Sequence, residues 1–230
     1  MNLSPADTNY PRGYAQTRRL FDDHIAVSAT DPRSAHNHAL PQESGPLARM
    51  APIRQKAYAA GRAAAHQAMR DLGHPLAPVL MAPDRAPVWP TGLTGSISHS
   101  QTCCIAALGR VDQVAALGVD VEEDSDLDQD LLTTVCTVDE RAWLSVLPKS
   151  QAGRMAKLIF SAKECAYKCQ YSRSKTLFGF DTLCVTPDPA CGQFEATFLT
   201  DIRHFPAGTR LAGRFAIEDG LIVTAMILRS

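Results

Sequence analysis

The chain has 230 residues, of which 45% are hydrophobic and 20% are charged, and its formal net charge is −1. This composition allows one large or two small domains with a sizeable buried core. The near-zero charge excludes the uniformly basic field that many nucleic-acid-binding proteins use. No run of about 18 apolar residues occurs, so no membrane-spanning helix is expected.

The seven cysteines are too few for a disulfide scaffold in a chain of this length. No CxxC pair occurs, so we interpret them as reduced, mostly buried thiols, with zinc ligation as the weaker alternative. Residues 1–20 lack the apolar segment of a secretory signal. Together these features predict a cytoplasmic protein.

The first elements are predicted from composition and from helix and turn signals. Residues 1–50 are rich in Pro, Ser, Asp and His, and we expect irregular structure with short strands around "DDHIAVSA" (22–29). Residues 53–72 are Ala-rich and predict a helix, with Gly73 in the position of a C-cap. Five prolines make residues 74–92 extended or loop.

Two strands are predicted next, over 95–109 ("GSISHSQTCCIAALG") and 114–122 ("VAALGVDVE"), with "RVDQ" as the turn between them. If they form a hairpin, His99 lies at the same open end as the acidic residues that close the second strand. A short helix is expected over 139–147, where Thr137 and Glu140 have the spacing of a capping box.

Residues 151–171 predict a second long helix, and four strands follow it, over 178–187, 194–199, 213–220 and 221–228. The order of helix and strands thus occurs twice. We therefore predict an α+β fold of two similar α/β halves, residues 1–115 and 116–230.

The stretch "GVDVEED" (118–124) places several carboxylates at the end of a strand. Asp120 and Glu122 are two residues apart, so both side chains point to one face, where their charges repel. A hard cation between them would relieve the repulsion, and oxygen ligands suit Mg²⁺. The alternative is a solvated acidic turn.

Glu164 and Lys168 are four residues apart on the second long helix, in the order that favours an ion pair. A surface pair would stabilise the helix by only a few tenths of a kcal/mol. Apolar residues flank both charges, which indicates a partly buried position instead. Glu164 could then complete a metal site, and Lys168 could contact a phosphate or accept a proton.

Further cationic and hydroxyl side chains could bind an anion. Ser98 and His99 lie in the serine-rich "SISHS", Arg54 and Arg62 lie within about a quarter turn of each other on the first helix, and Arg85 lies in a loop. Each could equally be an ordinary strand histidine or a solvated arginine. No P-loop or GxGxxG motif occurs. The residues alone therefore predict a Mg²⁺-dependent enzyme acting on a phosphate ester or diphosphate.

At these residues the chain resembles the 4′-phosphopantetheinyl transferases, in particular the enterobactin synthase component D and surfactin-type branch. Three motifs match in order: "WPTGLTGSISHS" (89–100), "LGVDVEE" (117–123) and "FSAKECAYK" (160–168). The "LFGFDTLCV" stretch (177–185) also fits. The resemblance extends from about residue 47 to the C-terminus, and residues 1–45 match poorly.

The resemblance implies a holo-[acyl-carrier-protein] synthase. Such an enzyme transfers the phosphopantetheine arm of coenzyme A to a serine of a carrier protein and releases adenosine 3′,5′-bisphosphate. It implies two halves related by pseudo-twofold symmetry, with coenzyme A and Mg²⁺ between them. The implied partners are acyl or peptidyl carrier domains of fatty-acid, polyketide or non-ribosomal peptide synthases, including siderophore pathways, and we expect a monomer.

The resemblance also assigns roles to residues. Asp120, Glu122 and Glu164 are the implied Mg²⁺ ligands, Glu164 is the implied general base, and Lys168 would contact the phosphate under attack. The implied coenzyme A contacts are Arg54, Arg62, Arg85 (a lysine in some relatives), Ser98, His99, Lys163 and Lys168. Replacing Arg62 with alanine should then raise the KM for coenzyme A.

Other acidic and basic residues have less specific expectations. Glu123, Asp124 and Asp126 are expected to lie in a solvated turn. A carrier protein would dock on an apolar patch of the C-terminal half whose basic neighbours come from Lys149, Arg154, Lys157, Arg173 and Lys175. Two alternatives remain open: a coenzyme A-binding regulator without transfer activity, and a Mg²⁺-dependent phosphohydrolase.

Overall fold

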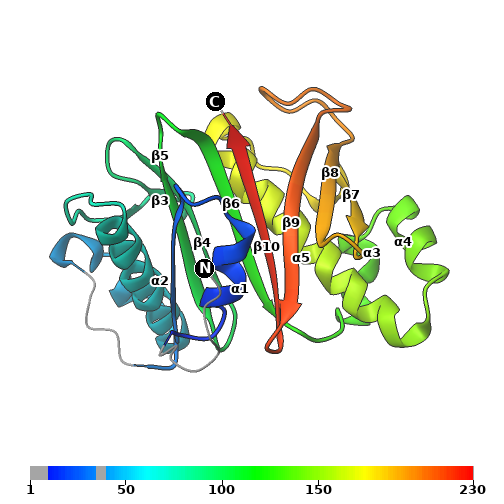
Figure 1. Cartoon of the computed structure of the whole chain (residues 1–230), viewed down its shortest axis with the longest axis horizontal. Helices are drawn as coiled ribbons and strands as arrows, with labels where there is room; N and C mark the ends of the chain where they lie inside the picture. The colour runs from blue at the N-terminus through cyan, green and yellow to red at the C-terminus, as the bar shows by residue number, and fades with distance from the viewer. Residues whose placement is uncertain (1–9, 35–39, 230) are drawn as a thin grey trace.

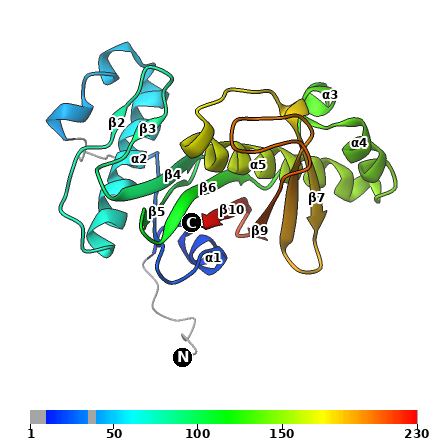
Figure 2. The same cartoon turned by 90° about the horizontal axis from the view of Figure 1, so that it is seen from above.

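The computed structural model describes residues 10–34 and 40–229. Two antiparallel sheets lie side by side, a three-stranded sheet of order β1-β5-β4 and a five-stranded sheet of order β6-β10-β9-β8-β7 (Figure 1). Helix α2 covers the first sheet and helix α5 covers the second (Figure 2). This combination of helices and antiparallel sheets confirms the α+β fold class. Within the described residues, no helix is both long and apolar enough to cross a membrane.

The N-terminal region holds one strand that was expected and one helix that was not. Strand β1 (Ala26–Thr30) falls in the predicted stretch. Helix α1 (Tyr14–Leu20) lies where irregular structure was expected, which corrects that prediction. It has only seven residues, and neither an acidic first turn nor a side-chain cap announces it. Parts of residues 1–50, namely 1–9 and 35–39, lie outside the described residues.

Helix α2 (Pro52–Asp71) confirms the first predicted long helix. A proline in its first turn starts it, and Gly73 follows its end with a positive φ of 65°, the conformation that glycine adopts most readily. The proline-rich segment after it contains only the two-residue strands β2 (Leu80–Met81) and β3 (Pro87–Val88). The loop prediction for that segment is confirmed in outline.

The predicted central hairpin is wrong. Residues 95–109 form two strands, β4 (Leu93–His99) and β5 (Cys104–Arg110), joined by a tight turn, and β5 pairs with β1 and β4. Strand β6 (Val114–Glu123) pairs instead with β10, in the other sheet. His99 still reaches the acidic end of β6, because β4 and β6 lie side by side where the two sheets meet (Figure 1).

The C-terminal elements follow the prediction closely. After the short α3 (Leu132–Val135), helix α4 (Val138–Ser145) begins with the expected capping box between Thr137 and Glu140. The second long helix is α5 (Lys149–Ser174). The four predicted strands are β7 (Leu183–Asp188), β8 (Gln193–Phe198), β9 (Arg210–Glu218) and β10 (Leu221–Arg229).

Three hydrophobic clusters hold these layers together: one between α2 and the first sheet, one between the two sheets, and one between α5 and the second sheet. Along β6, Val119 and Val121 point into the cluster between the sheets. Asp120 and Glu122 alternate with them and therefore face α5. Gly118 lets α5 come close, because a Cβ there would collide with the carbonyl oxygen of Cys165.

Each half contains a buried glutamate that ties three segments together. Glu43 Oε2 accepts the N–H of Leu40 (2.7 Å), and its Oε1 accepts the N–H of Val79 (2.6 Å) and contacts Nε2 of His66 (2.9 Å). His66 lies on α2, so this carboxylate fixes the proline-rich segment to the helix.

In the second half Glu140 accepts the N–H groups of Thr137 and Val185, each at 2.6 Å, and contacts Lys163 of α5 at 2.8 Å. Each glutamate accepts the backbone N–H of the residue three positions before it, Leu40 or Thr137, and His66 and Lys163 each follow their glutamate by the same 23 positions. Both halves thus use one arrangement to join a helix start to a long helix.

The buried Glu43 predicts an acid-dependent loss of stability. Burial alone would raise its pKa, but the hydrogen bonds from His66, Val79 and Leu40 outweigh burial, and the folded-state pKa lies below its usual 4.5. The stability that this carboxylate contributes is therefore complete above about pH 4.5 and is lost as the pH falls through the lower folded-state pKa. Urea unfolding of Glu43→Gln between pH 7 and pH 3 should show a shallower acid decline than the wild type.

At pH 7, Glu43→Gln should also lower the free energy of unfolding by about 1–3 kcal/mol, because a glutamine cannot accept both backbone N–H groups. The matched control is Glu195→Gln, whose carboxylate forms an exposed pair with Arg210 at 3.4 Å. An equal acid decline in both variants and the wild type would contradict the assignment.

Candidate active site

The site centres on Asp120, which is buried where β4, β6 and α5 meet. Its Oδ1 accepts hydrogen bonds from Nζ of Lys168 (2.6 Å) and Oγ of Ser98 (2.7 Å). Its Oδ2 accepts one from Oγ of Ser161 (2.8 Å). The three motifs that are far apart in the sequence therefore converge on one carboxylate.

Lys168 is held in its charged form. Removal from water would lower its pKa, but the charges of Asp120 and Glu164 outweigh that effect and raise it. Its ammonium also reaches Oγ of Ser98 (3.0 Å) and the carbonyl of Val119 (3.5 Å). The direct ion-pair partner of Lys168 is thus Asp120 on the facing strand, rather than its helical neighbour Glu164.

The carboxyl groups of Glu164 and Glu122 lie near Asp120 and Lys168. The positive charges around them offset their negative charges only in part. Burial raises the pKa of Glu164, and the charge of Asp120 adds to that effect while Lys168 opposes it. Burial and Asp120 raise the pKa of Glu122 to about 7, although Lys157 lies 3.4 Å away. Negative charge therefore exceeds positive charge here, which is the condition a divalent cation would relieve.

The described part of the chain contains no group of three or more His, Cys, Asp or Glu side chains already arranged to hold a metal ion. The carboxylates of Asp120, Glu122 and Glu164 supply the right donor type, and the charge excess fits a cation. The three predicted ligands lie near one another. Because Lys168 is paired with Asp120, they are not yet arranged around a common metal position.

A cationic end adjoins the carboxylates. Partial removal from water and the positive charges of Lys168 and Arg54 lower the pKa of His99, so its ring is neutral at pH 7 and lies near both cations. Arg54 is exposed on the first turn of α2. Ser98, expected to contact a nucleotide phosphate, is instead hydrogen-bonded to Asp120 and Lys168.

A groove of about 700 Å³ runs from this group between the two halves. Its walls are the β2–β3 segment and β4 on one side and the C-terminal part of α5 on the other. The lining includes Arg85, Trp89, Tyr167 and Lys168. The hydroxyl of Tyr171 donates to Asp84, so a hydrogen bond joins the two walls. The groove is large enough for an extended small molecule that reaches Lys168.

Two of the predicted ligands, Arg62 and Lys163, are buried and already have partners within the chain. Arg62 is buried; its Nε donates to the carbonyl of Val79 (2.8 Å), and its guanidinium stacks on Tyr58, 4.1 Å from the ring centre. Lys163 is 1% exposed, and its ammonium is used by Glu140 and by the carbonyls of Val135 (2.8 Å) and Phe180 (2.9 Å). Both cations hold chain segments together.

The expected solvated turn after β6 is wrong for two of its carboxylates. Glu123 accepts hydrogen bonds from Ser100 (2.7 Å) and from the N–H of Thr102 (3.0 Å), which fixes the β4–β5 turn beside His99. Asp124 accepts from Nε of Arg154 (2.6 Å). Sequence reasoning also missed Ser161, although it lies three residues before Glu164 in the same motif and shares its helix face.

The two arginines of α2 should respond differently to replacement. Arg62→Ala removes the donor to Val79 from a buried site and should lower the free energy of unfolding by about 1–3 kcal/mol, with little change in the KM for coenzyme A, the substrate that the resemblance implies. Arg54→Ala should leave stability unchanged and raise that KM about tenfold. Thermal unfolding and steady-state kinetics separate the two. A raised KM with normal stability for Arg62→Ala would restore its predicted role.

Comparisons with known proteins cover most of the chain. Residues 42–109 match the family described as "4'-phosphopantetheinyl transferase N-terminal domain", and residues 116–217 match the "4'-phosphopantetheinyl transferase superfamily". The chain is 34% identical to the 4'-phosphopantetheinyl transferase Svp of Streptomyces mobaraensis over 217 residues, covering 93% of this chain and 85% of that protein.

Two further relatives cover different shares of the chain. It is 31% identical to the 4'-phosphopantetheinyl transferase PptT of Mycobacterium tuberculosis, over 82% of this chain and 86% of that protein. It is 38% identical to enterobactin synthase component D of Salmonella typhimurium, but only over 58% of this chain and 55% of that protein.

Proposed function

The chain belongs to the 4′-phosphopantetheinyl transferase superfamily, and on that premise we propose a specific reaction. It transfers the phosphopantetheine arm of coenzyme A to a serine hydroxyl of a carrier-protein domain, depends on Mg²⁺, and releases adenosine 3′,5′-bisphosphate. The observation that carries the proposal is the contact of Lys168 with Asp120, with Glu164 and Glu122 beside it, at the end of a groove between the halves.

Coenzyme A would bind with its nucleotide toward the cationic end and its arm along the groove. Arg54 and His99 are the exposed candidates for the nucleotide phosphates at that end, and Arg85 is an exposed candidate within the groove. Trp89 and Tyr167 offer aromatic walls for the uncharged arm. Arg62 and Lys163 support this site by fixing the segments around it, and we assign them no direct contact.

The chemistry needs a base for the serine and a positive charge for the leaving group. Glu164 is half-buried and its pKa is raised, so it is suited to accept the proton of the serine hydroxyl, directly or through a water molecule. The serine oxygen attacks the β-phosphorus, and the bond to the bridging diphosphate oxygen breaks. Lys168 stabilises the charge that develops on the departing bisphosphate. Its longest present contact, to the carbonyl of Val119, is the one a phosphate oxygen would replace.

Mg²⁺ would be held by Asp120, Glu122 and Glu164, and it would neutralise the diphosphate oxygens when bound. The donor type and the unrelieved negative charge of these residues support this assignment. Release of Asp120 from Lys168 would free one of its oxygens for the ion.

We also propose that the two halves meet near residue 115 and are related by a pseudo-twofold axis. In each half, the strand before the long helix pairs with the last strand of that half, and this last strand pairs with the strand before it. The resulting orders are β1-β5-β4 and β6-β10-β9. The Glu43–His66 and Glu140–Lys163 contacts repeat the same arrangement. The two family matches fall on either side of this boundary.

The proposed partners are acyl or peptidyl carrier domains of fatty-acid, polyketide or non-ribosomal peptide synthases, with siderophore pathways among them. Val138 and Val146 at the two ends of α4 are 71% and 79% exposed, and Lys149 at the start of α5 is exposed too, so they are candidates for apolar and cationic contacts with a carrier. Arg154 and Lys157 are already engaged by Asp124 and Glu122. A monomeric, cytoplasmic protein of the holo-[acyl-carrier-protein] synthase class is part of the same proposal.

Analysis of the nucleotide products tests this reaction against its alternatives. With coenzyme A, Mg²⁺ and an apo carrier protein, chromatography should show adenosine 3′,5′-bisphosphate, and its amount should equal the amount of carrier modified. A phosphohydrolase would release nucleotide or phosphate without any carrier. A regulator would bind coenzyme A in a calorimeter and release no product. Either result would contradict the proposal.

A further inference from the structure

The first strand of the smaller sheet has an open edge. Strand β1 pairs with β5 along all five residues, from Ala26 with Leu108 to Thr30 with Cys104, in an unbroken register. No other strand among residues 10–34 and 40–229 pairs with its second edge. In an antiparallel pair, alternate residues direct their N–H and C=O groups away from the partner strand. The outer edge of β1 therefore presents unpaired backbone donors and acceptors.

Within residues 10–34 and 40–229, this edge lacks the devices that usually prevent strand addition. Natural edge strands are protected by lysine, proline, a bulge or a covering segment. The sequence of β1 is AVSAT, without a charge or a proline, and its pairing with β5 has no bulge. An unprotected edge of this kind is the surface to which an extended peptide adds in β-augmentation.

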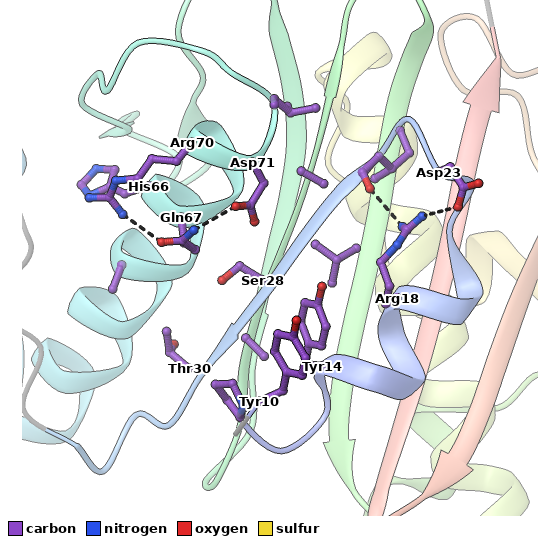
Figure 3. A pocket seen from close by; sticks show the side chains of 17 residues that line it. Tyr10, Tyr14, Arg18, Asp23, Ser28, Thr30, His66, Gln67, Arg70 and Asp71 are labelled. Carbon is purple, nitrogen blue, oxygen red and sulfur yellow. Dashed lines mark hydrogen bonds and ion pairs between the residues drawn. The ribbon is translucent and has the colours of Figure 1, made fainter. Parts of the chain in front are cut away.

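A cavity of about 750 Å³ lies along this edge. Every residue from Ala26 to Thr30 lines it, with α2 on one side and α1 on the other (Figure 3). The cavity is slightly larger than the active-site groove and lies at the opposite edge of the sheet from β4, which carries Ser98. The edge is thus reached through a groove flanked by two helices.

The two walls differ in chemistry. On the α1 side, the rings of Tyr10 and Tyr14 stack with their centres 4.4 Å apart and form an aromatic surface. On the α2 side, the wall carries the polar side chains of Gln67, Arg70 and Asp71, which are linked to one another by hydrogen bonds (Figure 3).

The floor adds a polar group that has no partner. Ser28 is 6% exposed and lines the cavity, and its hydroxyl makes no hydrogen bond to any described residue. This hydroxyl is therefore free to bond to a bound molecule.

We propose that this groove binds an extended segment of a partner polypeptide, which adds to β1 as a further strand. Five residues of β1 span about 16 Å, so the segment would contribute about five residues. Successive side chains of a strand point to opposite sides. The segment should therefore alternate apolar residues, facing Tyr10 and Tyr14, with polar residues, facing Gln67, Arg70 and Asp71. This interaction is separate from the transfer reaction.

A phage-displayed library of linear heptapeptides tests the proposal. It is selected on the full-length wild type and counter-selected on Ala63→Arg, because Ala63 lines the groove on α2 and an arginine there would fill it without disturbing the helix. The control is Ala190→Arg in the turn between β7 and β8, where the alanine is exposed and lies at the far edge of the other sheet. Synthetic copies of the enriched peptides should bind Ala63→Arg at least about tenfold more weakly than the wild type or Ala190→Arg.

Backbone methylation then distinguishes strand addition from other binding. Methylating the amide nitrogens of one alternate set of peptide residues should weaken binding about tenfold, and methylating the other set should not. Enrichment of no peptide, tolerance of both methylated sets, or equal binding to Ala63→Arg would overturn the proposal. Self-association of the wild type that is lost in Ala63→Arg would assign the edge to a second copy of the chain and would also overturn it. Transfer activity should be unchanged in Ala63→Arg.

Discussion

Replacement of Glu164 by glutamine should lower the rate of phosphopantetheine transfer by about 10²- to 10⁴-fold, the range expected for loss of a general base. Glutamine has the same shape but cannot accept the proton of the carrier serine. It also removes one of the carboxylates proposed to hold Mg²⁺. Initial rates with a carrier protein in excess measure the effect.

The fold of Glu164→Gln should remain intact, because burial has already raised the pKa of Glu164 and no ion pair among the described residues depends on its charge. Its thermal unfolding temperature should stay within a few degrees of the wild type. Glu195→Gln, the same change at the exposed Arg210 pair, serves as the control for rate and stability. A transfer rate for Glu164→Gln within a few-fold of the wild type would remove Glu164 from the mechanism.

The second large effect is expected at Lys168. Lys168→Met keeps the apolar stem of the side chain but removes the charge, and transfer should fall by about 10²- to 10³-fold, as when one oxyanion donor is lost. Stability should fall by about 1–3 kcal/mol, because Asp120 is buried and would keep only the hydroxyls of Ser98 and Ser161 as partners.

A double variant separates these two consequences. Lys168→Met combined with Asp120→Asn removes the uncompensated charge, so urea unfolding should show most of the lost stability restored. Transfer should remain low, because both groups are proposed to act in the reaction. Recovery of the rate together with stability would show that Lys168 acts only through the packing of Asp120.

Local sequence signals predicted most of the secondary structure. The Ala-rich composition and Gly73 defined α2, and the Thr137–Glu140 capping box defined α4, because these signals act within a few residues. The turn between β4 and β5 was missed because "SQTC" contains neither Gly nor Pro. It is held instead by Glu123, a residue about twenty positions away whose contact the local sequence does not encode.

The same distinction applies to the site. Strand alternation and helix periodicity showed which residues share a face of one element, Asp120 with Glu122 and Glu164 with Lys168. Only the resemblance implied that the two elements form one site, and the direct contact of Lys168 with Asp120 was not predicted. Arg62 and Lys163 also occupy positions that the resemblance assigns to ligand contacts, but in the fold both side chains are buried. Their partners, Val79 and Glu140, lie in segments whose placement depends on the whole fold. Whether a cation is buried or free for a ligand is therefore decided by long-range packing.

The central claim is that the carboxylates and Lys168 between the two halves carry transfer to a carrier protein. Intact-protein mass spectrometry of a panel of apo acyl and peptidyl carrier proteins, each incubated with this protein, coenzyme A and Mg²⁺, tests it most directly. We predict that at least one carrier gains the mass of one phosphopantetheine arm, and that EDTA or Glu164→Gln prevents the gain. An unchanged mass for every carrier, with coenzyme A still bound, would contradict the claim.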